Sequence, residues 1–107
     1  MKDVSLMRQF LGDTAYVRII DFLVESKGEE FTKKQIAEGA EVSRATVFNA
    51  WSAIEKNGIV RVTRAFGKTK LYTLNGRNPL VQRLLDLERA LITQAMERHR
   101  TVLAEHR

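Results

Sequence analysis

Apolar residues in the first quarter of the chain recur with the period of an α-helix. A short helix is predicted over residues 3–11, with three apolar residues on one side: Leu6, Phe10 and Leu11. A longer helix follows, and either Asp13 or Thr14 can cap its start. Its apolar positions form one stripe: Tyr16, Ile19, Ile20, Leu23 and Val24. We interpret this stripe as core packing, and a face that binds a partner is the alternative.

Residues 31–56 predict two short helices joined by a tight turn. Thr32 can cap the first helix, and Gln35 three positions later completes a capping box. Ser43 can cap the second helix. Between the helices there is room only for a turn: Gly39, Ala40 and Glu41. Two helices separated by so few residues form a helix-turn-helix, whose second helix commonly enters the major groove of DNA.

The second helix of this pair has two faces of different character. Its apolar residues fall on one side and should face the core: Val47, Ala50, Trp51 and Ile54. We assign Trp51 to this core rather than to a base-stacking surface. The other side carries small, polar or unexpectedly apolar residues: Arg44, Ala45, Thr46, Phe48, Asn49 and Ser52.

The chemistry of base edges explains the residue types on that second side. A merely solvated helix would favour Glu and Lys there, because these are better helix formers than Asn, Thr or Ser. Asn49 can pair bidentately with adenine, Ser and Thr can donate or accept, and Ala or Phe can meet a thymine methyl. Arg44 can bind a phosphate or a guanine. Phe48 has two readings, since it can touch DNA or cover an edge of the core.

After Gly58 the pattern changes from helical to extended. Residues 59–64 and 69–74 are rich in Val, Ile, Thr and Tyr, and Ala65 to Lys68 between them contain the glycine that a hairpin loop requires. Alternation places Val60 with Val62 on one face. Four basic residues and no acidic one populate the hairpin: Arg61, Arg64, Lys68 and Lys70. They suit a phosphate backbone, and protection of a strand edge is the compatible alternative.

Asn78 followed by Pro79 predicts the start of a last helix, which can extend to about Glu105. Leucines recur on it with the spacing of a coiled-coil seam: Leu80, Leu84, Leu87 and Leu91. So much leucine exceeds what a small core needs, and we expect part of this face to bind a second copy of the chain. The predicted dimerisation residues are Leu84, Leu87, Leu91, Ile92, Ala95 and Met96.

Charge and composition narrow the class of function. The net charge of the 107 residues is +5, and residues 31–76 alone hold 8 basic against 3 acidic side chains, which favours a polyanionic partner. The chain has no cysteine and no apolar run long enough to span a bilayer, so we expect a cytoplasmic protein without a membrane partner. We also expect no cofactor and no enzymatic activity. His99 and His106 have no cysteine, carboxylate pair, phosphate-binding loop or metal-ligand spacing beside them.

The order of these elements resembles a winged helix-turn-helix, and local motifs resemble small archaeal transcription regulators of the MarR-like and ArsR-like winged-helix superfamily. The matching segments are GDTAYVRIIDFL, KKQIAEGAEVSRATV, KNGIV, GKTKLYTLN and NPLV. The resemblance implies a homodimer whose recognition helices enter the major groove and whose wings reach the DNA backbone or minor groove. One position departs from the pattern, because Glu41 occupies the turn where glycine is usual.

The predicted fold class is therefore mainly α with a small β-hairpin (α+β). Residues 1–77 form the winged helix-turn-helix domain, with recognition helix 43–56 and wing 59–74, and residues 78–107 form the dimerisation helix. The predicted DNA-binding residues are Lys33, Arg44, Ala45, Thr46, Phe48, Asn49, Ser52, Arg64, Lys68 and Lys70. The predicted function is sequence-specific binding of double-stranded DNA at a pseudo-palindromic operator by a homodimeric transcription regulator. The alternative is a winged-helix module for protein contacts, with Phe48 and Phe66 as anchors; a small-molecule effector is left unknown.

Overall fold

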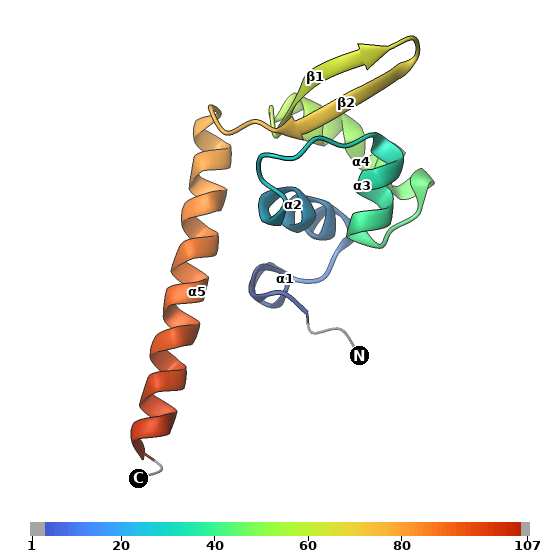
Figure 1. Ribbon diagram of the computed structural model, residues 1–107. Helices are drawn as coiled ribbons and strands as arrows, with labels where there is room; N and C mark the ends of the chain where they lie inside the picture. The colour runs from blue at the N-terminus through green and yellow to red at the C-terminus, as the bar shows by residue number, and fades with distance from the viewer. Residues whose placement is uncertain (1–3, 106–107) are drawn as a thin grey trace.

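The structure, a computed structural model, describes residues 4–105 and consists of packed helices with a hairpin that projects from one end of them (Figure 1). In chain order the elements are α1 (Leu6–Leu11), α2 (Ala15–Glu25), α3 (Lys33–Ala40), α4 (Arg44–Lys56), β1 (Val60–Phe66), β2 (Thr69–Leu74) and α5 (Pro79–Glu105). The hairpin rises from the end where α4 and α5 approach each other, and α5 runs past α1. A mainly helical chain with one antiparallel hairpin and a long last helix confirms the predicted fold class.

The core is built from the apolar faces of α2, α3 and α4, closed by the hairpin and the start of α5. Its buried apolar residues are Met7, Ile19, Ile20, Leu23, Val24, Ile36, Ala37, Ala40, Val47, Trp51, Ile54, Ile59, Val60, Tyr72, Leu74 and Val81. Core packing of the α2 stripe and the assignment of Trp51 are thus confirmed. The predicted apolar side of α1 was wrong, because Met7 is buried while Phe10 and Leu11 are 64% and 44% exposed. A helix of only six residues gives too little periodicity to fix its buried side.

The helix ends follow the predicted capping chemistry with one correction. Thr14, and not Asp13, caps α2, and the capping box between Thr32 and Gln35 is formed in both directions. Gly39 and Ala40 do not belong to the turn but extend α3, so the turn comprises Glu41 to Ser43. The helix passes so close to the ring of Phe22 at position 39 that any side chain there would collide with it, which explains the glycine inside α3.

Glu41 is in the left-handed region, with φ 58° and ψ 46°, and it ends α3 where a glycine would be unstrained. An L-residue pays a steric cost in this conformation, because its Cβ crowds the next carbonyl oxygen. The departure from the usual glycine therefore leaves the geometry of the helix-turn-helix intact at a local energetic cost.

The hairpin is longer at its tip than the sequence suggested. Its loop has two residues, Gly67 and Lys68, instead of four, because Ala65 and Phe66 pair with β2. A bulge lies between Val62 and Arg64, and the regular alternation breaks there. Before the bulge, Val60 and Val62 pair in regular register with Leu74 and Tyr72, so they lie on one face as predicted; Val60 is buried, but Val62 is 48% exposed.

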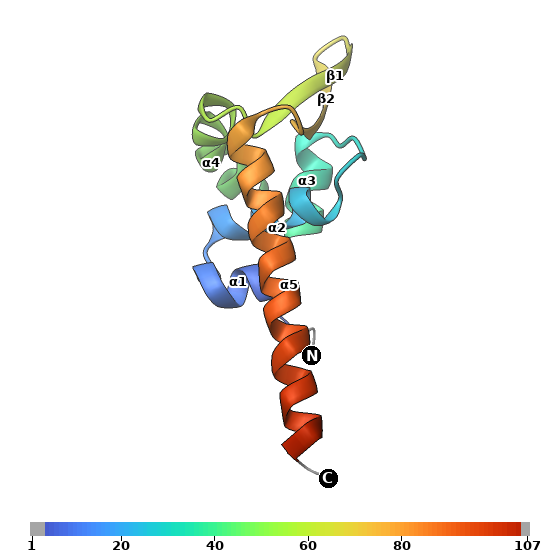
Figure 2. The ribbon, with the colours of Figure 1, turned by 90° about the vertical axis from the view of Figure 1, so that its left-hand side faces the viewer.

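The last helix begins at the predicted residue, and its C-terminal half extends away from the other elements. Asn78 accepts a hydrogen bond from the Leu80 backbone N–H (2.9 Å), and its amide donates to the carbonyls of Asn57 and Gly58 (2.8 Å each), which ties α5 to the end of α4. In both views the C-terminal half of α5 extends beyond the other elements (Figures 1 and 2). Leu84 and Leu91 pack in part against the core of their own chain. They are therefore only partly available for a second copy.

Candidate nucleic-acid interface

The outer face of α4 is open, as a reading face must be. Arg44, Ala45, Asn49 and Ser52 are exposed, and Phe48 is 77% exposed. The alternative that Phe48 covers an edge of the core is therefore wrong. Thr46 differs from the others because it is half-buried and its hydroxyl lies 2.8 Å from that of Ser43, so it helps to cap α4.

The start of α3 and the wing together form a basic cleft of about 370 Å³. Its lining residues are Thr32, Lys33, Lys68, Thr69, Lys70 and Tyr72. The Lys33 ammonium lies 5.0 Å from the centre of the Trp51 ring, so a core aromatic of α4 holds this cation beside that helix. Within residues 4–105, neither Lys68 nor Lys70 has an acidic partner. The structure thus brings three predicted phosphate-binding lysines to one place, although Lys33 is far from the other two in sequence.

Arg64, unlike Lys68 and Lys70, has an acidic partner among the described residues. Its guanidinium forms an ion pair with Glu30, whose second carboxylate oxygen accepts a hydrogen bond from the Thr63 hydroxyl (2.6 Å). The hydrogen bond from Arg64, and then the one from Thr63, hold the pKa of Glu30 below its usual range. The guanidinium also lies 5.9 Å from the ring of Phe66. Sequence reasoning missed Glu30, because nothing in local periodicity links it to a wing residue 34 positions later.

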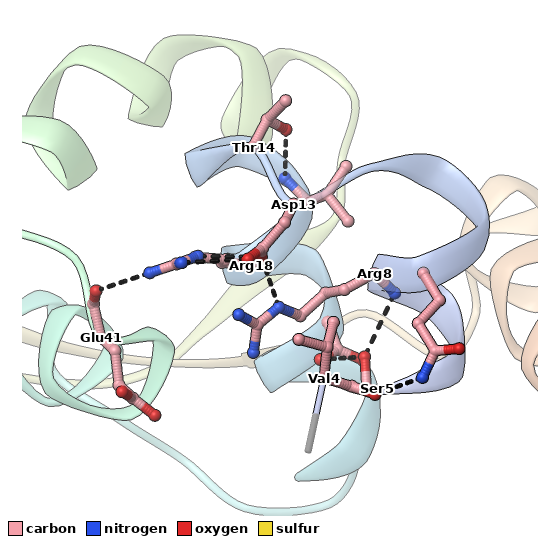
Figure 3. A network of polar contacts seen from close by, with 10 residues as sticks. Val4, Ser5, Arg8, Asp13, Thr14, Arg18 and Glu41 are labelled. Atoms are coloured by element: carbon pink, nitrogen blue, oxygen red, sulfur yellow. Dashed lines mark hydrogen bonds and ion pairs between the residues drawn. The ribbon is translucent and has the colours of Figure 1, made fainter. Parts of the chain in front are cut away.

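A second polar network holds the turn of the helix-turn-helix (Figure 3). Asp13 accepts hydrogen bonds from Arg8 (2.6 Å) and Arg18 (2.9 and 3.1 Å), and Arg18 also donates to the backbone carbonyl of Glu41 (3.2 Å). The guanidinium of Arg8, followed by that of Arg18, holds the pKa of Asp13 well below its usual range. The loop before α2 is thereby connected to the left-handed residue that sets the angle between α3 and α4. Sequence reasoning did not identify this connection either.

No group of three or more potential metal ligands occurs among residues 4–105. His99 lies exposed on α5, and His106 is outside the described residues. Within that same part of the chain, no helix is both long and apolar enough to cross a lipid bilayer.

Comparison with solved structures defines the class of fold. No protein-family profile and no curated protein matches the sequence. The AntR antimony-specific transcriptional repressor is 24% identical, with a TM-score of 0.57 over 86% of this chain and 78% of that one. A variant of ZitR from Lactococcus lactis is 18% identical, with a TM-score of 0.60 over 97% of this chain and 93% of that one. The homodimeric winged helix-turn-helix DNA-binding domain of a possible ArsR-family regulator from Mycobacterium bovis is 22% identical, with a TM-score of 0.57 over 88% and 82%.

This chain therefore has the fold of winged-helix transcription regulators, and its structural neighbours include members of the MarR and ArsR groups. That part of the sequence resemblance is confirmed at the level of the fold. The neighbours come from Methanosarcina mazei as well as from Mycobacterium bovis and Lactococcus lactis, so they do not favour an archaeal origin over any other.

Proposed function

We propose that this chain is a sequence-specific regulator of transcription that binds double-stranded DNA as a homodimer at a pseudo-palindromic operator. The observation that carries the proposal is the adjacency of two surfaces of different chemistry. The outer face of α4 offers hydrogen-bonding and small side chains that suit base edges, and the basic cleft beside it offers lysine ammonium groups that suit phosphates.

Each part of the interface has a separate role in this proposal. Asn49 and Ser52 contact base edges in the major groove, with Ala45 and Phe48 against thymine methyl groups. Arg44, at the first turn of α4, contacts a phosphate or a guanine. Thr46, which already bonds Ser43, contributes at the edge of this face. Lys33, Lys68 and Lys70 neutralise backbone phosphates and set the register of the protein on the duplex.

The homodimer is proposed because α5 carries apolar side chains that its own chain leaves uncovered. Ile92, Met96 and Leu103 are 44%, 60% and 57% exposed, and Ala95, Met96 and Leu103 line a common hollow on the helix. Leu87, half-buried, lies on the same helix. A second α5 with the same surface would cover these residues, and the two-fold symmetry would match a pseudo-palindrome with half-sites about one helical turn apart. We place the protein in the cytoplasm and assign it no catalytic activity.

The proposal is tested by selecting bound sequences from random duplex DNA and then measuring binding of variants to the selected site and to unrelated DNA. Asn49→Ala should lose about 1–3 kcal/mol of discrimination between the two DNAs. Lys70→Ala should weaken both alike and lower the slope of log affinity against log salt by about 0.9. Arg98→Ala, which removes the same charge from an exposed position on α5, is the matched control. Affinity that is independent of salt, or no enriched sequence, would contradict the proposal.

Phe48 and Phe66 favour a second candidate, a winged-helix module for protein contacts, because both are exposed aromatics (77% and 60%). Such rings are common anchors of protein interfaces. A variant with both rings replaced by alanine separates the two functions. If the rings serve protein contacts, its retention on DNA equals that of the wild type; if they serve DNA, retention on the selected site falls.

A further inference from the structure

Among residues 4–105, Arg64 is the one cation of the wing that has an acidic partner, and this partner is the carboxylate of Glu30. Arg64 is 61% exposed and would otherwise face solvent with Lys68 and Lys70, but its guanidinium is bound to Glu30 and lies near the ring of Phe66. The side chain of Glu30 is 30% exposed, so the pair is partly sheltered from water. A phosphate that binds Arg64 must therefore replace the carboxylate or approach it.

The position of Glu30 is fixed independently of Arg64. The neighbouring Phe31 exchanges both backbone hydrogen bonds with Tyr72 (2.7 and 2.8 Å), and the Glu29 carbonyl accepts a hydrogen bond from Thr73 (2.7 Å). Residues 29–31 are thus attached along β2, and the second carboxylate oxygen of Glu30 accepts from Thr63 at the bulge of β1. The carboxylate is held at the wing in advance, with little freedom to swing away when DNA approaches.

We propose that Glu30 tunes the affinity of the wing for DNA by competing with backbone phosphates for Arg64. This inference rests on the proposed DNA-binding function, and it assigns Arg64 a smaller part in phosphate binding than the sequence alone predicts. Arg64 contributes less to phosphate binding than Lys68 or Lys70, because part of its attraction is already satisfied within the chain. Phosphate contacts do not depend on the DNA sequence, so the carboxylate of Glu30 limits non-specific binding. Discrimination between DNA sequences is then left to α4.

The test compares Glu30→Gln with Glu29→Gln on unrelated duplex DNA over a range of salt concentrations. Both changes remove one negative charge, but the side chain of Glu29 is exposed and has no ion pair in the described part of the chain. The glutamine at position 30 can still accept the Thr63 hydrogen bond, so the wing keeps its anchor. We expect Glu30→Gln to bind about two- to fivefold more tightly than Glu29→Gln, the range of one exposed charge pair. Its salt slope should be steeper by about 0.9.

One further comparison identifies Arg64 as the group released. In an Arg64→Gln background, Glu30→Gln should give no gain beyond that of Glu29→Gln. Equal DNA affinity of Glu30→Gln and Glu29→Gln, or weaker binding by Glu30→Gln, would overturn the inference. The proposed function would still stand in that case, provided that the wild type binds DNA. Absence of salt-dependent DNA binding by every protein would overturn both.

Discussion

Glu41 gives the sharpest test of the link between sequence and turn geometry, because it occupies a left-handed position at the junction of α3 and α4. We predict that Glu41→Gly stabilises the protein. The left-handed conformation costs an L-residue roughly 1–2 kcal/mol, and glycine avoids this cost. Glycine in turn loses about 0.4–1 kcal/mol through the greater entropy of the unfolded chain. The expected net gain is about 0.5–1 kcal/mol, or roughly 2–5 °C in Tm for a domain of this size.

The hydrogen bond that fixes this turn survives the substitution, because Arg18 donates to the backbone carbonyl of Glu41 and not to its side chain. The substitution does remove a charge that attracts Arg8 and Arg18. Glu41→Gln is the matched control, since it removes the same charge and keeps a side chain in the left-handed conformation. The difference in stability between the glycine and glutamine variants therefore excludes the effect of the charge and reports the backbone strain together with any uncharged contacts of the side chain.

Urea and thermal unfolding at one fixed protein concentration provide the measurement, because the stability of the proposed dimer would depend on concentration. We expect the glycine variant to be more stable than the glutamine variant at every salt concentration. If the two variants are equally stable, or if the glycine variant is less stable, the argument from left-handed strain is refuted.

Two other predictions concern the polar network of the turn and the face of α5. Removal of the Asp13 carboxylate by Asp13→Asn should destabilise the protein at neutral pH. Arg8 and Arg18 lower the pKa of Asp13 in the folded state, so the wild type should keep its full advantage in stability above the unfolded pKa of Asp13, near 3.8. This advantage should shrink as the pH falls below that value. Urea unfolding that shows a constant difference in stability down to about pH 2 would contradict the prediction. Met96→Glu should convert a dimer to a monomer in a solution mass measurement at micromolar concentration, whereas Gln94→Glu, on another side of α5, should not; equal masses for the two variants would contradict a dimer through this face.

Much of the fold was determined by the sequence alone. The capping residues Thr32 and Ser43, the apolar spacing of α2 and α4, and the pair Asn78 and Pro79 each act within one or two helical turns. Such local signals depend on hydrogen bonds and side-chain directions that the backbone period fixes in advance. For the same reason the helical period alone was enough to separate the outer face of α4 from its core face.

Tertiary structure decided which of the predicted charges are free. Local pattern assigned Arg64, Lys68 and Lys70 to one basic hairpin, but only folding brings Glu30 onto Arg64 and Lys33 beside the lysines. The buried side of α1 was likewise decided by packing, since six residues carry too weak a period. These contacts join residues far apart in sequence, so no local propensity encodes them, and their energies exist only after the chain has folded.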